Sequence, residues 1–217
     1  MARFFKSRIA TKGQAPGSLI LIGKQKMDRP EINLIEYDAE KLVEKQLDSI
    51  EEAAPCREND LVSWINIYVI HDLELIQRVG ELFELPALIL EDILNTDQRP
   101  KYEEGDTFNA FFLKMLKYDE DTKHITAEQV TLVLGETYVL TLQEQYGDVF
   151  DPIRERIRNT KRKARLNETD YLAYALLDTI VDNYVIIIET IGREIEELEK
   201  QVFGNPDKTI VEKIYTC

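Results

Sequence analysis

The sequence predicts an α/β fold in which a mixed, partly antiparallel sheet is covered by helices and followed by one long helix. Segments of alternating apolar residues are interspersed with segments of helical periodicity along most of the chain. Three central segments alternate and are separated by short turns, which is typical of an antiparallel meander: Thr107–Tyr118, Ile125–Leu134 and Tyr138–Gln143. With 217 residues and 44% hydrophobic content, the chain is large enough to bury a core.

The first part of the chain is predicted to contain an arm, two strands and a helix. Met1–Gly17 has the composition of a loose arm, and Leu19–Gly23 is a candidate for a short buried strand. Glu31–Tyr37 alternates like a second strand. Asp38 is placed to cap a helix over Ala39–Leu47 whose charges face outward.

An acidic linker, Asp48–Asp60, separates this part from three regular segments. They are expected in the order strand, helix, helix: Leu61–Val69, Leu73–Phe83 and Ala87–Leu94. Trp64 in the strand is interpreted as a core residue, because aromatic side chains are favoured in strands. Asp72 is positioned to cap the first helix, and Pro86 precedes the second.

Glu168–Phe203 carries apolar residues at helical spacing without a proline, which predicts one helix about 50 Å long. Asp178 and Asp182 lie four residues apart and therefore on one face. They are either buried with a partner or exposed on a polar stripe, and the spacing leaves both alternatives open. A shorter helix over Val149–Leu166 precedes this segment. The residues after Gly204 have the composition of a loop and the start of another helix.

The net charge of −14 argues against general binding to nucleic acids or anionic membranes. It is compatible with a protein that handles cations, although acidic soluble proteins are common. Two cysteines, Cys56 and Cys217, cannot form a disulfide framework, so a reducing cytoplasm is expected. The first residues lack an apolar signal core, and no run of about 18 apolar residues occurs, so we expect no membrane span within these residues.

Adjacent carboxylates on the predicted helix Ala87–Leu94 are the first candidates for metal chemistry. Glu91 and Asp92 lie side by side there, and Asp97 follows the helix. Mg2+ often keeps most of its water and contacts only one or two carboxylates, so such a pair suits it. A solvated acidic helix face has the same spacing, and the pattern alone favours that simpler interpretation.

A basic run, Asp151–Leu166, has a local charge of opposite sign to the rest of the chain. We interpret it mainly as compensation for acidic helices of the same protein, through these cations: Arg154, Arg156, Arg158, Lys161, Arg162, Lys163 and Arg165. No Gly-rich phosphate loop, CxxC, HExxH or GxSxG motif is present, and the two histidines, His71 and His124, are far apart. The sequence therefore does not indicate an enzyme.

Several motifs occur in order along residues 15–215: WIN at 64–66, LEDILN at 90–95, QRPK at 98–101, GDVFDP at 147–152 and RERIR at 154–158. Together they resemble the cytoplasmic domain of the CorA family of magnesium/cobalt transport proteins. The resemblance implies an α/β/α domain over residues 18–166, after the arm at 1–17. Residues 167–217 then form the long helix and the start of an antiparallel partner helix.

The family to which this resemblance points consists of homopentameric channels for divalent cations, chiefly Mg2+ with Co2+ as a second ion. Their stalk helix, two transmembrane segments and Gly-Met-Asn motif are not found in these residues. The resemblance thus implies a soluble fragment, on the cytoplasmic face of the inner membrane in the full-length protein.

The resemblance also implies a regulatory site for Mg2+ between neighbouring subunits that favours the closed pore. Asp92 takes the primary position with Glu91 beside it, Asp178 takes the secondary position, and a further acid belongs to the stalk of an adjacent subunit. Two alternatives remain: the cytoplasmic domain of a ZntB-like zinc transporter, and a standalone soluble signalling or scaffold domain. A metal-dependent hydrolase is a more distant alternative.

Overall fold

The computed structural model describes residues 13, 15–26, 29–159 and 168–204. Within these residues, seven strands form one sheet in the order β2-β1-β3-β7-β6-β5-β4. The strands are β1 (Glu31–Tyr37), β2 (Leu42–Leu47), β3 (Val62–Tyr68), β4 (Lys101–Glu104), β5 (Asn109–Asp119), β6 (His124–Leu134) and β7 (Tyr138–Gln143). The helices are the 3-10 helix η2 (Ile50–Arg57) and the α-helices α1 (Leu73–Phe83), α2 (Ala87–Leu94), α3 (Asp151–Asn159) and α4 (Thr169–Gly204).

The sheet is mixed, as the sequence predicts. The neighbours β3 and β7 run parallel, with Trp64 opposite Val139, and every other pair in this sheet is antiparallel. The strands β5, β6 and β7 form the predicted meander, in which Leu113 lies opposite Val130.

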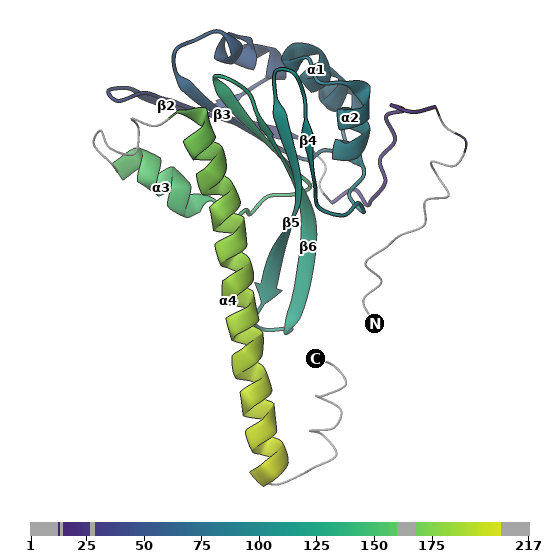
Figure 1. Cartoon of the computed structure of the whole chain (residues 1–217), viewed down its shortest axis with the longest axis vertical. Coiled ribbons are helices and arrows are strands. Elements are labelled where there is room, and N and C mark those ends of the chain that lie inside the picture. The colour runs from purple at the N-terminus through teal and green to yellow at the C-terminus, as the bar shows by residue number, and fades with distance from the viewer. Residues whose placement is uncertain (1–12, 14, 27–28, 160–167, 205–217) are drawn as a thin grey trace.

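Helices cover both faces of the sheet, which gives three layers (Figure 1). The helices η2, α1 and α2 pack on one face, and α3 and α4 pack on the other. Because side chains alternate along a strand, neighbouring residues serve different cores. On β1, Leu34 joins the first core and Ile35 the second. The predicted α/β/α architecture is confirmed.

Asp72 and Trp64 behave as the sequence predicts. The Asp72 carboxylate accepts a hydrogen bond of 3.0 Å from the Leu75 backbone N–H, so it caps the first turn of α1. The Trp64 side chain is buried, and its indole N–H donates a hydrogen bond of 2.9 Å to the Thr141 hydroxyl.

The predicted helix over Ala39–Leu47 is wrong, because Asp38 forms a tight turn instead of a helix cap. Its Oδ1 accepts hydrogen bonds of 2.7 Å from the Glu40 N–H and 2.6 Å from the Lys41 N–H. Such a turn reverses the chain, and β2 then pairs with β1 as a hairpin. The expected linker Asp48–Asp60 also differs, since it contains η2, whose buried residues include Ile50.

Three further elements differ from the prediction. Leu19–Gly23 forms no regular strand, and its one bridge joins Ile22 to Asn95. The short edge strand β4 has no counterpart in the sequence prediction. Within the described residues α3 begins at Asp151, two residues later than predicted, and the predicted end of that helix lies outside them. Most of the predicted arm and the residues after Gly204 also lie outside the described residues.

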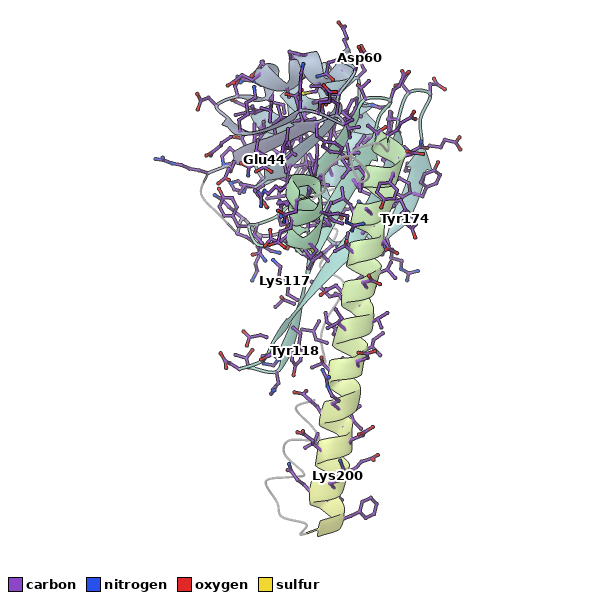
Figure 2. All side chains as sticks on the ribbon, turned by 90° about the vertical axis from the view of Figure 1, so that its left-hand side faces the viewer. Glu44, Asp60, Lys117, Tyr118, Tyr174 and Lys200 are labelled. Carbon is purple, nitrogen blue, oxygen red and sulfur yellow. The ribbon has the colours of Figure 1, made fainter. Side chains whose placement is uncertain are left out.

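The long helix α4 is confirmed, and its two halves differ in their surroundings. Leu172, Leu176 and Ile180 in the first half pack against the sheet. The second half extends past the central strands, and the β5–β6 hairpin runs beside it (Figures 1 and 2). There Glu194 accepts a hydrogen bond from the Tyr118 hydroxyl and lies 2.8 Å from Lys123 Nζ.

By length and composition, Thr169–Phe203 is the one helix in the described part of the chain that is long and apolar enough to cross a membrane. About 33% of its most apolar window is buried inside the protein. Core helices of soluble proteins pass the same test, so this property is weak evidence for a membrane span.

Candidate divalent-cation site

Asp92 lies half-buried near the C-terminal end of α2, and its carboxylate is held by a cation. Lys101, the first residue of β4, places its Nζ 2.6 Å from Asp92 Oδ2. The same ammonium group lies 3.0 Å from Oε1 of Glu103, two residues further along β4. Lys101 therefore bridges two carboxylates that belong to different elements.

The backbone of Asp92 is fixed from the sheet and from the loop after α2. Two side-chain amides donate to its carbonyl oxygen: Gln98 Nε2 at 2.6 Å and Gln129 Nε2 at 3.0 Å. Gln129, which is buried on β6, also donates a hydrogen bond of 3.0 Å to the carbonyl of Ile93. The last carbonyls of a helix lack partners within the helix, so these amides complete the end of α2.

Glu91 connects α2 to the segment that precedes the sheet. Its Oε2 accepts a hydrogen bond of 2.7 Å from the Gly17 backbone N–H. Gly17 adopts φ +81°, and a Cβ at this position would lie 2.9 Å from Cβ of Ala87. Glycine is required here by both its backbone conformation and the close approach to α2.

Asp178 lies in the other helical layer, exposed on α4, and Asp182 is exposed one turn later. Neither carboxylate has a hydrogen-bond or ion-pair partner within the described ranges. Of the two alternatives left open by the sequence, exposure is therefore correct, but the stripe is not polar, since Tyr174 and Val181 beside these carboxylates are also exposed. Because α2 and α4 cover opposite faces of the sheet, one chain does not bring Asp178 to Asp92 (Figure 1).

The carboxylates of α2 suit a hydrated Mg2+ ion only in part. Glu91 and Asp92 supply the oxygen donors that Mg2+ prefers, and one or two carboxylates suffice for it. Across residues 13, 15–26, 29–159 and 168–204, no group of three or more His, Cys, Asp or Glu side chains is arranged to hold a metal. Glu91 and Asp92 are therefore not part of a cluster of three such side chains within the described residues of one chain.

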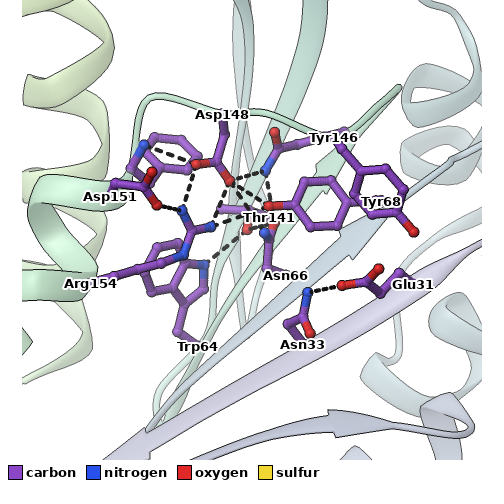
Figure 3. Close-up of polar contacts among 12 residues, drawn as sticks. Glu31, Asn33, Trp64, Asn66, Tyr68, Thr141, Tyr146, Asp148, Asp151 and Arg154 are labelled. Atoms are coloured by element: carbon purple, nitrogen blue, oxygen red, sulfur yellow. Dashed lines mark hydrogen bonds and ion pairs between the residues drawn. The ribbon is translucent and has the colours of Figure 1, made fainter. Parts of the chain in front are cut away.

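The GDVFDP motif forms a buried polar network that sequence reasoning did not assign (Figure 3). Asp148 accepts hydrogen bonds from the guanidinium of Arg154, from the Tyr68 hydroxyl and from the amides of Asn66 and Gln143. Burial opposes ionisation of Asp148, but the hydrogen bonds and charge of Arg154 outweigh it and hold the pKa of Asp148 below its ordinary value. The network joins β3, β7 and α3.

A second buried acid lies on β6. Glu128 Oε1 is 2.7 Å from Lys117 Nζ, and burial raises the pKa of Glu128 against the opposing effect of Lys117. Nearby, Glu144 accepts a hydrogen bond of 2.7 Å from the Gln129 backbone N–H and lies 2.8 Å from Lys26 Nζ.

The basic run is used within the protein wherever the structure describes its contacts. Arg154 pairs with Asp148 at 2.6 Å and with Asp151 at 2.9 Å, and Arg158 pairs with Glu44 at 2.8 Å. These arginines compensate acidic residues in the loop before α3, in α3 itself and in β2, and not the acidic helices that the sequence predicted. Residues 160–167 lie outside the described residues.

The fold therefore defines a three-layer α/β/α domain from which one long helix extends. A model of the family "CorA-like Mg2+ transporter protein" matches residues 59–217. The chain belongs to this family. It is 42% identical over 206 residues to the cobalt/magnesium transport protein CorA of Thermotoga maritima, covering 95% of this chain and 58% of that protein.

Solved structures share the fold. The soluble domain of CorA from Methanocaldococcus jannaschii matches with a TM-score of 0.59 at 22% identity, covering 84% of this chain and 69% of that one. The ZntB cytoplasmic domain from Vibrio parahaemolyticus matches with a TM-score of 0.55 at 14% identity, covering 85% and 70%. The chain spans 58% or less of the length of the curated relatives it matches.

Proposed function

We propose that this chain is the cytoplasmic regulatory part of a CorA-type divalent-cation channel at the inner membrane. In this proposal the complete protein is a homopentamer that transports Mg2+ and also Co2+. Intracellular Mg2+ binds between neighbouring subunits and favours the closed pore. Membership of a transporter family agrees with the expectation that the chain is not an enzyme.

The placement of the acids is the observation that supports this proposal. Asp92 is half-buried with a fixed backbone, whereas Asp178 is exposed on the opposite helical layer. Carboxylates on opposite sides of one subunit can meet only when a second copy is placed beside the first. In the proposed assembly, Asp92 is the primary ligand, Glu91 lies beside it, and Asp178 belongs to the secondary position.

Regulation then follows from differential binding. Carboxylates that face each other across an interface repel until a divalent ion lies between them. If Mg2+ binds this interface in the closed arrangement and not in the open one, it shifts the equilibrium by its difference in affinity for the two states. The protein supplies the carboxylates and the fixed α2 backbone, and the ion supplies the compensating charge.

A ZntB-like zinc transporter is the second candidate, since the ZntB cytoplasmic domain has the same fold. Transport of Mg2+, Co2+ and Zn2+ by the complete protein in vesicles distinguishes the two. A standalone signalling or scaffold domain would show no response to any of these ions.

The regulatory role is tested with Asp92→Asn in the complete protein reconstituted into vesicles. We expect Mg2+ on the cytoplasmic side to close the wild-type channel and to raise its melting temperature, and EDTA to reverse both effects. Asp92→Asn should weaken both responses, and Asp178→Asn should weaken them less. Asp182→Asn is the matched control, because Asp182 is exposed on the same helix one turn away. Unchanged Mg2+ responses in Asp92→Asn would remove Asp92 from the mechanism.

A further inference from the structure

The carboxylate of Asp92, which we assign to Mg2+, forms an ion pair with Lys101 in this structure. Lys101 Nζ lies 2.6 Å from Asp92 Oδ2, and both side chains are half-buried. A divalent ion and an ammonium group are attracted to the same oxygen and repel each other, so both cannot contact it at full strength. Binding of the metal at Asp92 therefore requires Lys101 to move or to weaken its contact.

A second acceptor for Lys101 is present next to it. Glu103 Oε1 lies 3.0 Å from the same Nζ, and its side chain is 46% exposed. The ammonium group also lies 5.1 Å from the centre of the Phe112 ring, a distance at which a cation is attracted to an aromatic face. These contacts allow the ammonium group to leave Asp92 without becoming free in solution.

We propose that Lys101 is a tethered counter-ion that holds Asp92 in the metal-free state and transfers to Glu103 when Mg2+ binds. Lys101 thereby sets the Mg2+ concentration at which the regulatory site fills. This inference rests on the proposed role of Asp92, and adds two residues that determine the affinity of the site without contacting the ion.

The competition predicts opposite effects for the two partners of the switch. Lys101→Met keeps much of the apolar stem and removes the competing charge, so it should lower the Mg2+ concentration for half-maximal effect by about fivefold, as expected for losing one partly exposed ion pair. Glu103→Gln removes the alternative acceptor and should raise that concentration. Lys101→Arg should also raise it, because a guanidinium can hold a carboxylate with two parallel hydrogen bonds.

The test is a titration of the complete protein with MgCl2, read by melting temperature and, separately, by channel closure. Lys45→Met is the matched control: it removes one positive charge from β2, the strand at the opposite edge of the sheet from β4. A purely structural role of Lys101 would lower the melting temperature without Mg2+ and leave the titration midpoint unchanged.

Asp92→Asn in the same titration separates the two hypotheses. If Asp92→Asn abolishes the response and Lys101→Met matches Lys45→Met, the counter-ion role is wrong while the regulatory site stands. If Asp92→Asn leaves the midpoint unchanged, the regulatory site itself is wrong. If Lys101→Met fails to fold, Glu103→Gln and Lys101→Arg still test the counter-ion role of Lys101. A Mg2+ titration midpoint that is unchanged or lowered in both variants overturns the inference.

Discussion

Arg154 donates two hydrogen bonds of 2.6 Å to the two carboxylate oxygens of Asp148. The guanidinium lies 5.0 Å from the centre of the Trp64 ring, and the Asp148 side chain is 1% exposed. This contact attaches α3 to the centre of the sheet. The GDVFDP motif therefore has a structural role: Asp148, its first aspartate, is the buried counter-charge for Arg154 of α3.

Asp148→Asn should lower the free energy of unfolding by about 3 kcal/mol, because it leaves Arg154 with the exposed Asp151 as a partner and without its buried counter-charge. Urea unfolding followed by the fluorescence of Trp64, the single tryptophan, measures this change. Asp151→Asn is the control: it contacts the same arginine at 2.9 Å but is 83% exposed, so its loss should stay below about 1 kcal/mol. Equal losses in the two variants would contradict the assignment of Asp148 as the main partner.

Glu128 should make the protein less stable as the pH rises. Burial raises its pKa above the ordinary value of 4.5, so between that value and the raised pKa the folded state binds the proton more tightly than the unfolded state. Stability therefore falls with pH across this window and is constant above it. Relative to Glu128→Gln, the wild-type free energy of unfolding should decrease as the pH rises from the ordinary pKa of 4.5 to the raised pKa of the folded state.

Urea unfolding of both proteins at a series of pH values measures this difference. Glu120→Gln serves as the control, because it removes a carboxylate from an exposed position in the turn of the β5–β6 hairpin. A difference that changes in the opposite direction would mean that the ion pair with Lys117, at 2.7 Å, outweighs burial.

Local sequence signals predicted the elements whose structure is determined locally. The alternation of β1 and β3, the Asp72 cap and the apolar periodicity of α4 each involve residues close in sequence. The failure at β2 has the same origin, because an aspartate before a charged segment suits both a helix cap and a tight turn. Pairing with β1 decides between them, and that pairing is a tertiary contact.

The candidate site was predictable only in part, for a similar reason. The motif LEDILN identified Glu91 and Asp92, but their partners come from elsewhere in the chain. Gln129 reaches α2 from 37 residues away, and Gly17 reaches Glu91 across 74 residues. Lys101 is close in sequence, yet its contact depends on β4, a four-residue edge strand without a clear alternating pattern.

Glu194 should restrain the tip of the β5–β6 hairpin against α4. Its carboxylate accepts a hydrogen bond from the Tyr118 hydroxyl and lies 2.8 Å from Lys123 Nζ. Glu194→Gln therefore removes the negative charge that holds both groups. We expect amide hydrogen exchange in the turn at residues 119–124 to accelerate severalfold while global stability hardly changes, because the contact lies at the surface.

Glu197→Gln is the matched control for this experiment, since Glu197 is exposed about one turn later on the same helix. Equal exchange rates in the two variants would show that the hairpin is held by other contacts. The next candidate for holding the hairpin is then Asn183, whose side-chain amide donates a hydrogen bond of 2.7 Å to the Leu116 carbonyl.

Gln129 should determine how firmly the end of α2 is held. Gln129→Leu introduces an apolar side chain of similar size and removes the donors to the carbonyls of Asp92 and Ile93. A buried carbonyl left without a partner costs about 1–3 kcal/mol, so the free energy of unfolding should fall by that amount. Gln98→Leu should cost less, because the Asp92 carbonyl would still accept from Gln129.

The double variant distinguishes two explanations of such losses. If both amides stabilise the same carbonyl of Asp92, the second substitution removes its last side-chain donor and leaves only the Asn95 backbone N–H at 3.2 Å, so the combined loss should exceed the sum of the single losses. Strict additivity would mean that Gln129 acts only through Ile93. Amide exchange should rise at the end of α2 and not in α1, since neither glutamine bonds to that helix. In the complete protein, the same variants should also raise the Mg2+ concentration needed for closure, because a less firmly held backbone leaves Asp92 less well positioned for the ion.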